Sequence, residues 1–212
     1  MNPPDSGLIA SGVMAGDTTR HIRGFLDFAM KSDEHDHGVY YFAIVASACY
    51  LESVLEESSV LWCKTESGND RGFQSRLMDK IAKDISRATG LDGWKQWMRV
   101  LYDVDLVTAL GDDWPTIKVL FDLRNQLAHG RTTKFMHFWN SDGNFLGMTT
   151  SGSSYEIPFE HLIQRKVIVV GPGTMPSAEH LLTGKVARYF FDAVSRAIYA
   201  LQRLPALKSL GR

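Results

Sequence analysis

The sequence predicts a mainly α-helical fold with a small β-hairpin or sheet insertion. Apolar residues recur at steps of three and four in several long segments, which is the spacing of amphipathic helices. One Asp-Gly pair separates two runs rich in aromatic residues, methionine and threonine, which is typical of a hairpin. With 212 residues, of which 44% are hydrophobic and 22% charged, the chain is long enough for one domain with a full core.

The N-terminal part of the chain is expected to form a loose lead and two helices. Residues 1–16 are rich in proline, glycine and serine, so we expect the single domain to cover residues 17–212. A short helix is predicted over 17–31 and a long helix over 38–64. The buried stripe of the long helix is expected to contain Tyr41, Ile44, Val45, Ala48, Glu52 and Leu55.

Three further helical segments are expected before the insertion. Residues 73–89 have apolar positions four apart, a short tryptophan-bearing segment lies around Trp94, and a turn of helix is predicted near 100–110. The most regular helix starts near Trp114 and ends at His129. Its predicted buried stripe is Trp114, Ile117, Leu120, Phe121, Arg124, Leu127 and Ala128.

The β elaboration is predicted over residues 132–171. Its hairpin covers 133–150 and turns at Asp142-Gly143. The β-branched run at 166–171 predicts a third strand. A C-terminal helix over about 177–204 then completes the domain.

Composition predicts a cytoplasmic protein without a membrane span, and we expect neither a metal ion nor a cofactor. No run approaches 18 consecutive apolar residues, and the first residues lack the basic start and apolar block of a signal peptide. The two cysteines, Cys49 and Cys63, have no metal-ligand spacing and are expected to be reduced thiols.

The net charge of −1 hides an uneven distribution of charge. Residues 1–64 hold four basic and nine acidic side chains, whereas residues 161–212 hold eight basic and two acidic ones. The near-neutral total argues against a protein whose main role is to coat nucleic acid. The basic C-terminal segment is either a path for RNA or a solvated helix face.

Residues 123–130, Leu-Arg-Asn-Gln-Leu-Ala-His-Gly, end the most regular helix. Arg124 falls on the apolar stripe, where an arginine is rarely placed without a partner or a role. Asn125 and His129 are four apart and share a helix face, and the helix dipole favours a protonated imidazole in the last turn. Together these side chains suit a phosphate ligand. The structural interpretation is a helix-end cap with a salt-bridged Arg124.

Arg124-Asn125-x-x-x-His129 resembles the Arg-x(4–6)-His signature of the HEPN superfamily of helical, often dimeric proteins. The resemblance covers the helices between about 38 and 130 and is specific only at this motif. Many HEPN proteins are metal-independent ribonucleases in toxin–antitoxin and antiviral defence systems. The resemblance therefore implies a HEPN-like helical bundle, an RNA substrate and cytoplasmic hydrolase activity.

The resemblance also implies roles for four residues. His129 would act as general acid or base, Arg124 would stabilise charge on the phosphate, and Asn125 would position either the histidine or the phosphate. Glu52 occupies a core position in the long helix and would support the site by orienting Arg124. Because positions five apart on a helix diverge by about 140°, we expect a homodimer in which two motif helices share one cleft.

Two alternative functions, and one residue that differs from the family pattern, affect which binding partners we expect. A non-catalytic HEPN-like module would bind a nucleotide or another protein, and an unrelated interaction protein would use Glu52 and Arg124 as a buried bridge. An antitoxin or regulatory partner is implied for the toxin interpretation. Some HEPN toxins have a tyrosine two residues after the histidine that a partner modifies, but that position is Arg131 here. This form of control does not apply unchanged.

Overall fold

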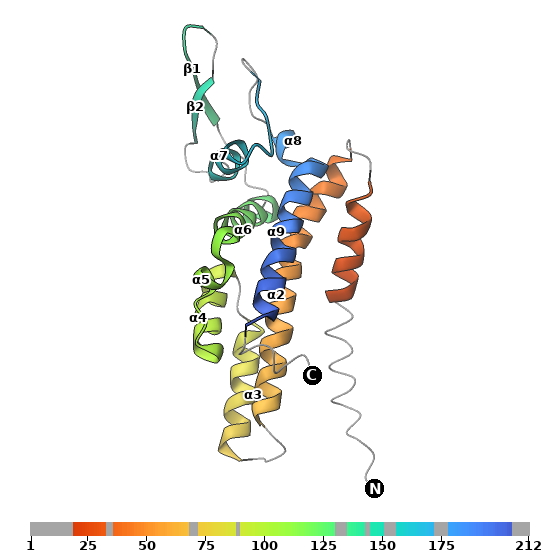
Figure 1. Ribbon diagram of the computed structural model, residues 1–212, viewed down its shortest axis with the longest axis vertical. Coiled ribbons are helices and arrows are strands. Elements are labelled where there is room, and N and C mark those ends of the chain that lie inside the picture. The colour runs from red at the N-terminus through yellow and green to blue at the C-terminus, as the bar shows by residue number, and fades with distance from the viewer. Residues whose placement is uncertain are drawn as a thin grey trace. The chain divides into compact units, whose positions relative to one another are not determined.

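The protein is mainly α-helical, which confirms the helical class that the sequence predicted (Figure 1). The structure is a computed structural model. It describes residues 19–32, 36–67, 72–87, 90–129, 135–142, 145–150, 156–171 and 178–204. The expected N-terminal lead lies outside the described residues.

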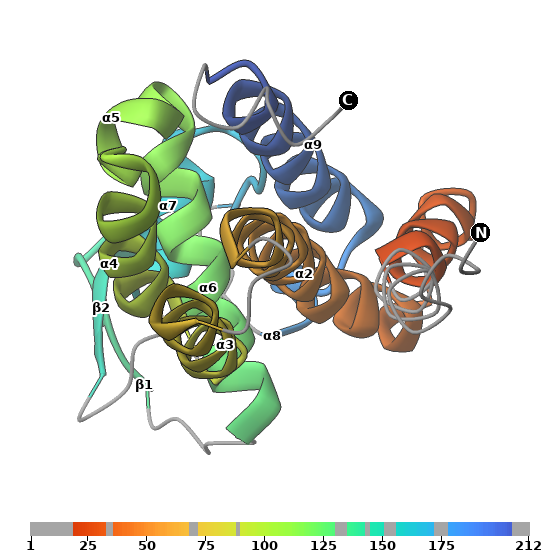
Figure 2. The ribbon, with the colours of Figure 1, turned by 90° about the horizontal axis from the view of Figure 1, so that it is seen from below.

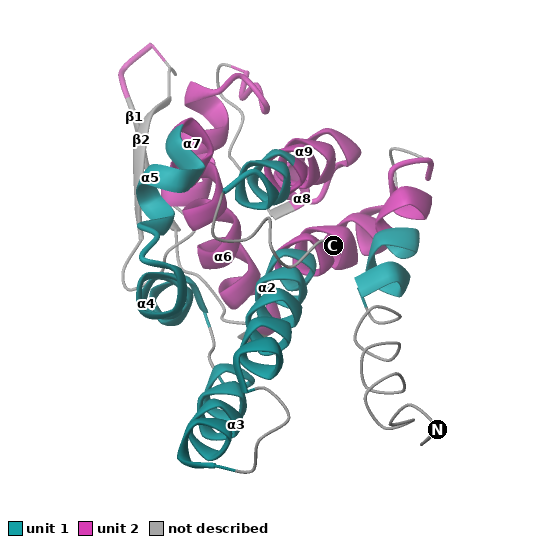
Figure 3. Cartoon of the chain, turned by 60° about the horizontal axis from the view of Figure 1, so that its bottom comes forward, with its two compact units in different colours: residues 1–25, 49–111, 196–212 teal, residues 26–48, 112–195 magenta. Residues whose placement is uncertain are grey.

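The chain forms two compact units that interleave in sequence (Figure 3). The first unit consists of residues 1–25, 49–111 and 196–212. The second unit consists of residues 26–48 and 112–195. The long helix α2 (His37–Ser67) therefore contributes its N-terminal part to the second unit and its C-terminal part to the first.

In the first unit, α3 (Phe73–Ile85) lies beside the C-terminal part of α2 (Figures 1 and 2). It ends four residues earlier than predicted, because the amide of Ser86 donates to the carbonyl of Ala82 and the amide of Arg87 donates to that of Asp84, which closes the helix. The short helix α5 (Leu106–Leu110) begins at Asp105, whose side chain accepts a hydrogen bond from the Val107 amide.

The tryptophan-bearing segment of the first unit is longer than the sequence predicted. It forms the 13-residue helix α4 (Gly90–Tyr102), which ends before Asp103 in a left-handed conformation with φ 52°. Its buried positions follow helical spacing: Leu91, Trp94, Met98, Leu101 and Tyr102. The prediction of only a short segment near Trp94 was therefore wrong, because these buried positions recur regularly enough to form one full face of a helix.

The second unit is built around α6 (Trp114–His129), which packs against α7 (Glu156–Gln164). The 3-10 turn η1 (Gly111–Asp113) leads into α6. Residues 19–29 are helical, as predicted for this segment, and Leu26 and Ala29 at its end are fully buried. The bounds of α6 agree with the predicted ones at both ends.

Two antiparallel strands follow α6, namely β1 (Phe135–Trp139) and β2 (Phe145–Thr150). Phe135 pairs with Thr150, and the register shifts between Phe138 and Trp139. This irregularity is the two-against-one pairing of a β-bulge, which increases the local twist of a hairpin.

The predicted β elaboration extends too far toward the C-terminus. Residues 156–164 form α7, and the run at 166–171 is not a strand. The amide of Lys166 donates to the carbonyl of Ile163, and the amide of Val167 donates to that of Leu162. This pattern, with Lys166 at φ 56°, is a Schellman cap, so the β-branched run closes a helix instead of extending a sheet.

The predicted C-terminal helix over 177–204 is divided into α8 (Ala178–Leu181) and α9 (Gly184–Gln202). Thr183 begins the second helix, since its hydroxyl accepts a hydrogen bond from the Val186 amide at 3.3 Å. A threonine cap inside an apolar run therefore ends one helix and starts another.

The helix α2 contains an 18-residue window with the hydropathy and length of a membrane span. The sequence predicted no span, because no run approaches 18 consecutive apolar residues. The finding is weak evidence for a membrane helix, since core helices of soluble proteins have the same composition.

Gly184 offers a test of packing in the second unit. A Cβ at this position would lie 2.9 Å from both Cζ and the hydroxyl oxygen of Tyr40. Tyr40 is 2% exposed, and its hydroxyl donates to the Ser32 carbonyl at 2.8 Å, so the ring has no room to withdraw. We expect Gly184→Ala to lower the free energy of unfolding by about 1–3 kcal/mol in urea denaturation.

Gly24→Ala is the matched control, because nothing lies within 4 Å of a Cβ at Gly24. Alanine should raise stability there by up to about 1 kcal/mol through its helix propensity. Equal effects of the two substitutions would contradict the close contact between Gly184 and Tyr40.

Candidate functional site

The helix α6 positions the predicted motif at its C-terminal end. Ile117, Leu120 and Leu123 are fully buried along its length, so the core of the second unit fixes the helix. The motif turn, which we define as residues 124–129, follows directly after these positions. Gln126 and Leu127 are buried within it, whereas Asn125 is exposed.

Arg124 and Asn125 contact each other in the motif turn. Arg124 Nη1 donates a hydrogen bond to Asn125 Oδ1 at 3.1 Å. The guanidinium carbon also lies 5.4 Å from the ring centroid of Phe121, one turn earlier, in a cation–π contact. The half-buried arginine is thus held from two sides, next to an amide that solvent reaches. A fixed cation beside an exposed amide is suited to binding an anion.

His129 is the last residue of α6, and its side chain lies outside the described part of the structure, as does Gly130. The predicted contact between Asn125 and His129 therefore stays a prediction. The backbone alone shows that Arg124 and His129 are separated by five helical positions, so they leave the helix axis in directions about 140° apart.

Glu52 lies on α2 in the first unit and is half-buried. Its Oε1 accepts a hydrogen bond from the backbone amide of Gly90 at 3.1 Å, at the start of α4. Burial raises the pKa of the neighbouring Glu56 carboxyl, and the charge of Glu52 adds to this rise. Because Glu52 and Arg124 belong to different units, the expected pair between them stays a prediction.

Tyr41 contacts the motif turn. The sequence analysis had assigned it only to the buried stripe of the long helix. Its hydroxyl donates to the carbonyl of Leu127 at 2.8 Å, across 86 positions of sequence. Both residues belong to the second unit. No spacing rule connects two residues so far apart, so sequence reasoning had no signal for this bond.

Three polar side chains from different helices meet near the start of α6. The hydroxyls of Thr116 and Tyr189 are 2.9 Å apart, and His161 Nε2 lies 3.1 Å from the first and 2.9 Å from the second. We call these three residues the hydroxyl–histidine cluster. His161 lies on α7, inside the range 132–171 for which the sequence predicted a β elaboration.

Burial lowers the pKa of His161 below its ordinary value of 6.5, and the nearby positive charge of Arg165 adds to this effect. The imidazole is therefore neutral at pH 7, and one ring nitrogen can accept a hydrogen bond from a hydroxyl. Thr116 is 3% exposed, so its hydroxyl depends on this cluster for hydrogen bonding. The cluster joins α6, α7 and α9 at one point.

Part of the basic C-terminal segment has structural contacts. Lys185 Nζ donates to the carbonyl of Lys166 at 3.2 Å, and Arg188 Nη2 donates to that of Met30 at 2.7 Å. The guanidinium of Arg203 lies 5.3 Å from the ring centroid of Tyr199. These contacts give several of the basic side chains a role in the fold and leave the expected RNA path a prediction.

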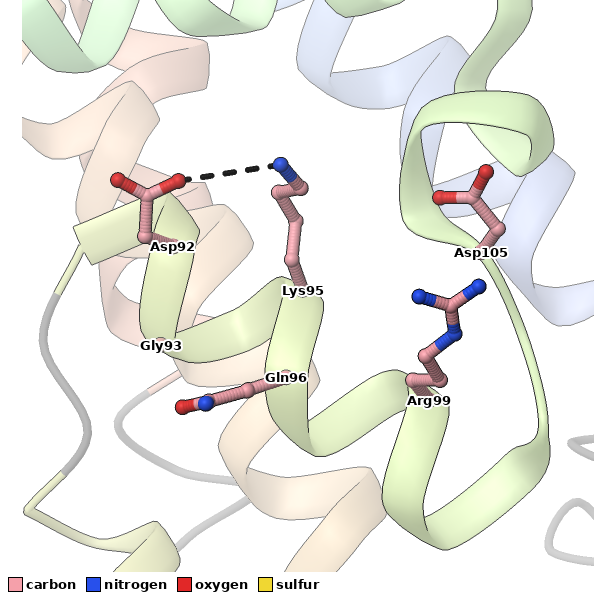
Figure 4. Close-up of a pocket in the computed structure, with 6 residues that line it drawn as sticks. All are labelled: Asp92, Gly93, Lys95, Gln96, Arg99 and Asp105. Carbon is pink, nitrogen blue, oxygen red and sulfur yellow. Dashed lines mark ion pairs between the residues drawn. The ribbon is translucent and has the colours of Figure 1, made fainter.

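A polar pocket of about 390 Å³ lies in the first unit, away from the predicted motif in sequence (Figure 4). Its lining residues are Asp92, Gly93, Lys95, Gln96, Arg99 and Asp105. Lys95 Nζ lies 3.9 Å from Asp92 Oδ1. Hydrogen bonds from Thr108 and Val107 lower the pKa of Asp105, with smaller effects from Arg99 and Lys95. Since two acidic and two basic side chains line it, the pocket does not favour a polyanion.

Comparison with known proteins adds no assignment: no protein-family model, no curated protein and no solved structure matches the chain.

The hydroxyl–histidine cluster predicts a loss of stability in acid. The folded state holds His161 with a lowered pKa, so below about pH 6.5 the unfolded chain binds more protons at this residue than the folded chain does. The contribution of His161 to the free energy of unfolding is complete above pH 6.5. It is lost as the pH falls toward the pKa of His161 in the folded state. Urea midpoints measured from pH 7.5 to 5.0 should decline, and His161→Gln should make the decline shallower.

His21→Gln provides a matched control on the helix at 19–29. This histidine is exposed, so its replacement should leave the decline as steep as in the original protein. A decline that is unchanged in His161→Gln would contradict the assignment of acid sensitivity to the cluster.

Proposed function

We propose that the protein is a HEPN-type metal-independent endoribonuclease, with its catalytic residues in the motif turn at the end of α6. The observation that carries the proposal is the arrangement of Arg124. Its guanidinium contacts Asn125 at 3.1 Å and the ring of Phe121, and the helix ends five residues later at His129. This is a preorganised cation beside an exposed amide, on the helix that ends at the motif histidine.

The proposed reaction is an internal transesterification of RNA. The 2′-oxygen attacks the adjacent phosphorus and loses its proton to a base, while the bond from phosphorus to the 5′-oxygen breaks and that oxygen takes a proton from an acid. The products are a 2′,3′-cyclic phosphate and a 5′-hydroxyl. His129 acts as acid or base, Arg124 stabilises the charge on the phosphate, and Asn125 orients the group it contacts.

The position of the motif favours a site shared by two copies of the chain. The C-terminal end of a helix carries partial negative charge, so a phosphate binds there only if side chains supply positive charge. A single α6 directs Arg124 and His129 about 140° apart. A homodimer with two motif turns across a twofold axis provides both residues to one phosphate.

We further propose a HEPN-like bundle in which the hairpin of β1 and β2 is an elaboration. Glu52 on α2 is a supporting residue in this proposal, and its carboxylate accepts a hydrogen bond from the Gly90 amide. A role as a cytoplasmic toxin or defence effector, with an antitoxin or regulatory partner, follows from the family resemblance alone.

A non-catalytic HEPN-like module that binds a protein is the second candidate. Two large aromatic side chains of the second unit favour it, since Phe28 is 63% exposed and Phe42 is 62% exposed. Exposed aromatic residues are enriched at protein interfaces. A nucleotide-binding module without catalysis would use the same motif turn.

His129→Ala should abolish RNA cleavage without changing the fold. The purified protein is incubated with total RNA in EDTA, and cleavage is followed by gel electrophoresis with circular dichroism as the test of folding. Removal of an essential acid or base typically costs about 10²- to 10⁴-fold in rate. Arg124→Ala should show a loss of similar size, because its charge acts on the same phosphate.

His21→Ala is the control, because this exposed histidine lies on a helix of the first unit and outside the motif. Cleavage that requires a divalent metal, or that persists in His129→Ala, would overturn the proposed mechanism.

The shared site predicts a homodimer in solution. Light scattering at micromolar concentration should give about twice the chain mass of 23.8 kDa. Mixing inactive His129→Ala with inactive Arg124→Ala should restore part of the activity, since one mixed site then contains both residues. A strict monomer, with and without RNA, would instead support the protein-interaction candidate.

A further inference from the structure

The last turn of α6 has a specific attachment to the N-terminal part of α2. The hydroxyl of Tyr41 donates a hydrogen bond of 2.8 Å to the carbonyl of Leu127. Leu127 lies between Asn125 and His129 in the motif turn. The bond therefore reaches the backbone at the centre of the predicted site, from a residue 86 positions away.

This carbonyl needs a partner because of its place in the helix. The last four carbonyl groups of an α-helix have no amide of the same helix to accept from. Since α6 ends at His129, the carbonyl of Leu127 is one of these four. The phenol of Tyr41 provides a donor to this terminal carbonyl.

The ring of Tyr41 is itself held in position. It packs edge-on against Phe42, with 5.2 Å between centroids and 81° between planes. The preceding residue, Tyr40, is buried against Gly184 and bonded to Ser32, so this part of α2 has a fixed place within the second unit. A donor on a fixed helix restricts the movement of the turn that it contacts.

We propose that Tyr41 is a positioning residue for the motif turn. Its hydroxyl holds the backbone of the last turn of α6, so that Asn125 and His129 keep the orientation that the reaction requires. This inference rests on the proposed function. Tyr41 acts through the backbone of Leu127 and takes no part in the chemical step.

Tyr41→Phe tests the inference, because phenylalanine keeps the ring and removes only the donor. With the full-length protein, steady-state cleavage of a defined RNA gives kcat and KM, and hydrogen exchange gives the opening of residues 124–129. We expect kcat to fall on the order of tenfold with KM little changed, since a small misplacement of catalytic groups slows chemistry more than binding. Exchange in the motif turn should become faster.

Tyr50→Phe is the matched control, since it removes a hydroxyl from the same helix in the first unit. It should leave kcat, KM and exchange in the motif turn unchanged. An equal effect of Tyr41→Phe and Tyr50→Phe would overturn the inference, because it would indicate a general loss of stability.

Failure of this inference is distinguishable from failure of the proposed function. If the original protein cleaves RNA and Tyr41→Phe cleaves it with the same kcat, Tyr41 is not a positioning residue. If the original protein does not cleave RNA, the proposed function fails, and hydrogen exchange still decides whether Tyr41 holds the turn. Unchanged exchange in Tyr41→Phe would overturn the inference in either case.

Discussion

Burial of the apolar stripe of α6 is the constraint on which the second unit depends. Ile117, Leu120 and Leu123 have no exposed surface, so the rotation of α6 about its axis is set by the core. That rotation fixes where each side chain of the following turn leaves the helix. Arg124 then lies at the edge of the buried surface, where Phe121 and Asn125 contact its guanidinium.

Hydrogen bonds from other helices also hold α6 in position. The hydroxyl–histidine cluster joins α7 and α9 to the start of α6, and Tyr41 joins α2 to its end. The Thr116 hydroxyl in this cluster is 3% exposed and would otherwise have no partner, so its bonds are costly to lose. A helix attached at both ends is a suitable support for catalytic groups, because such groups must keep their geometry while charge moves on the substrate.

The sequence predicted the parts of this arrangement that depend on local spacing. The bounds of α6 followed from its apolar periodicity, with a proline in its first turn and a histidine at its end. The prediction of a strand over 166–171 was wrong, because the β-branched residues of this run favour a strand but its amides cap α7. The bond from Tyr41 to Leu127 and the cluster around His161 join residues 28 to 86 positions apart. Such pairs depend on tertiary packing, which periodicity does not encode.

The chemical ends of the cleaved RNA test the central claim most directly, because they report the reaction itself. Mass spectrometry of a defined RNA, cleaved in EDTA, should show a 2′,3′-cyclic phosphate on one fragment and a 5′-hydroxyl on the other. Those ends arise when the neighbouring 2′-oxygen is the nucleophile, as the proposed roles of Arg124 and His129 require. A 5′-phosphate with a free 3′-hydroxyl, or an intact RNA, would contradict the assignment of a metal-independent ribonuclease site to the end of α6.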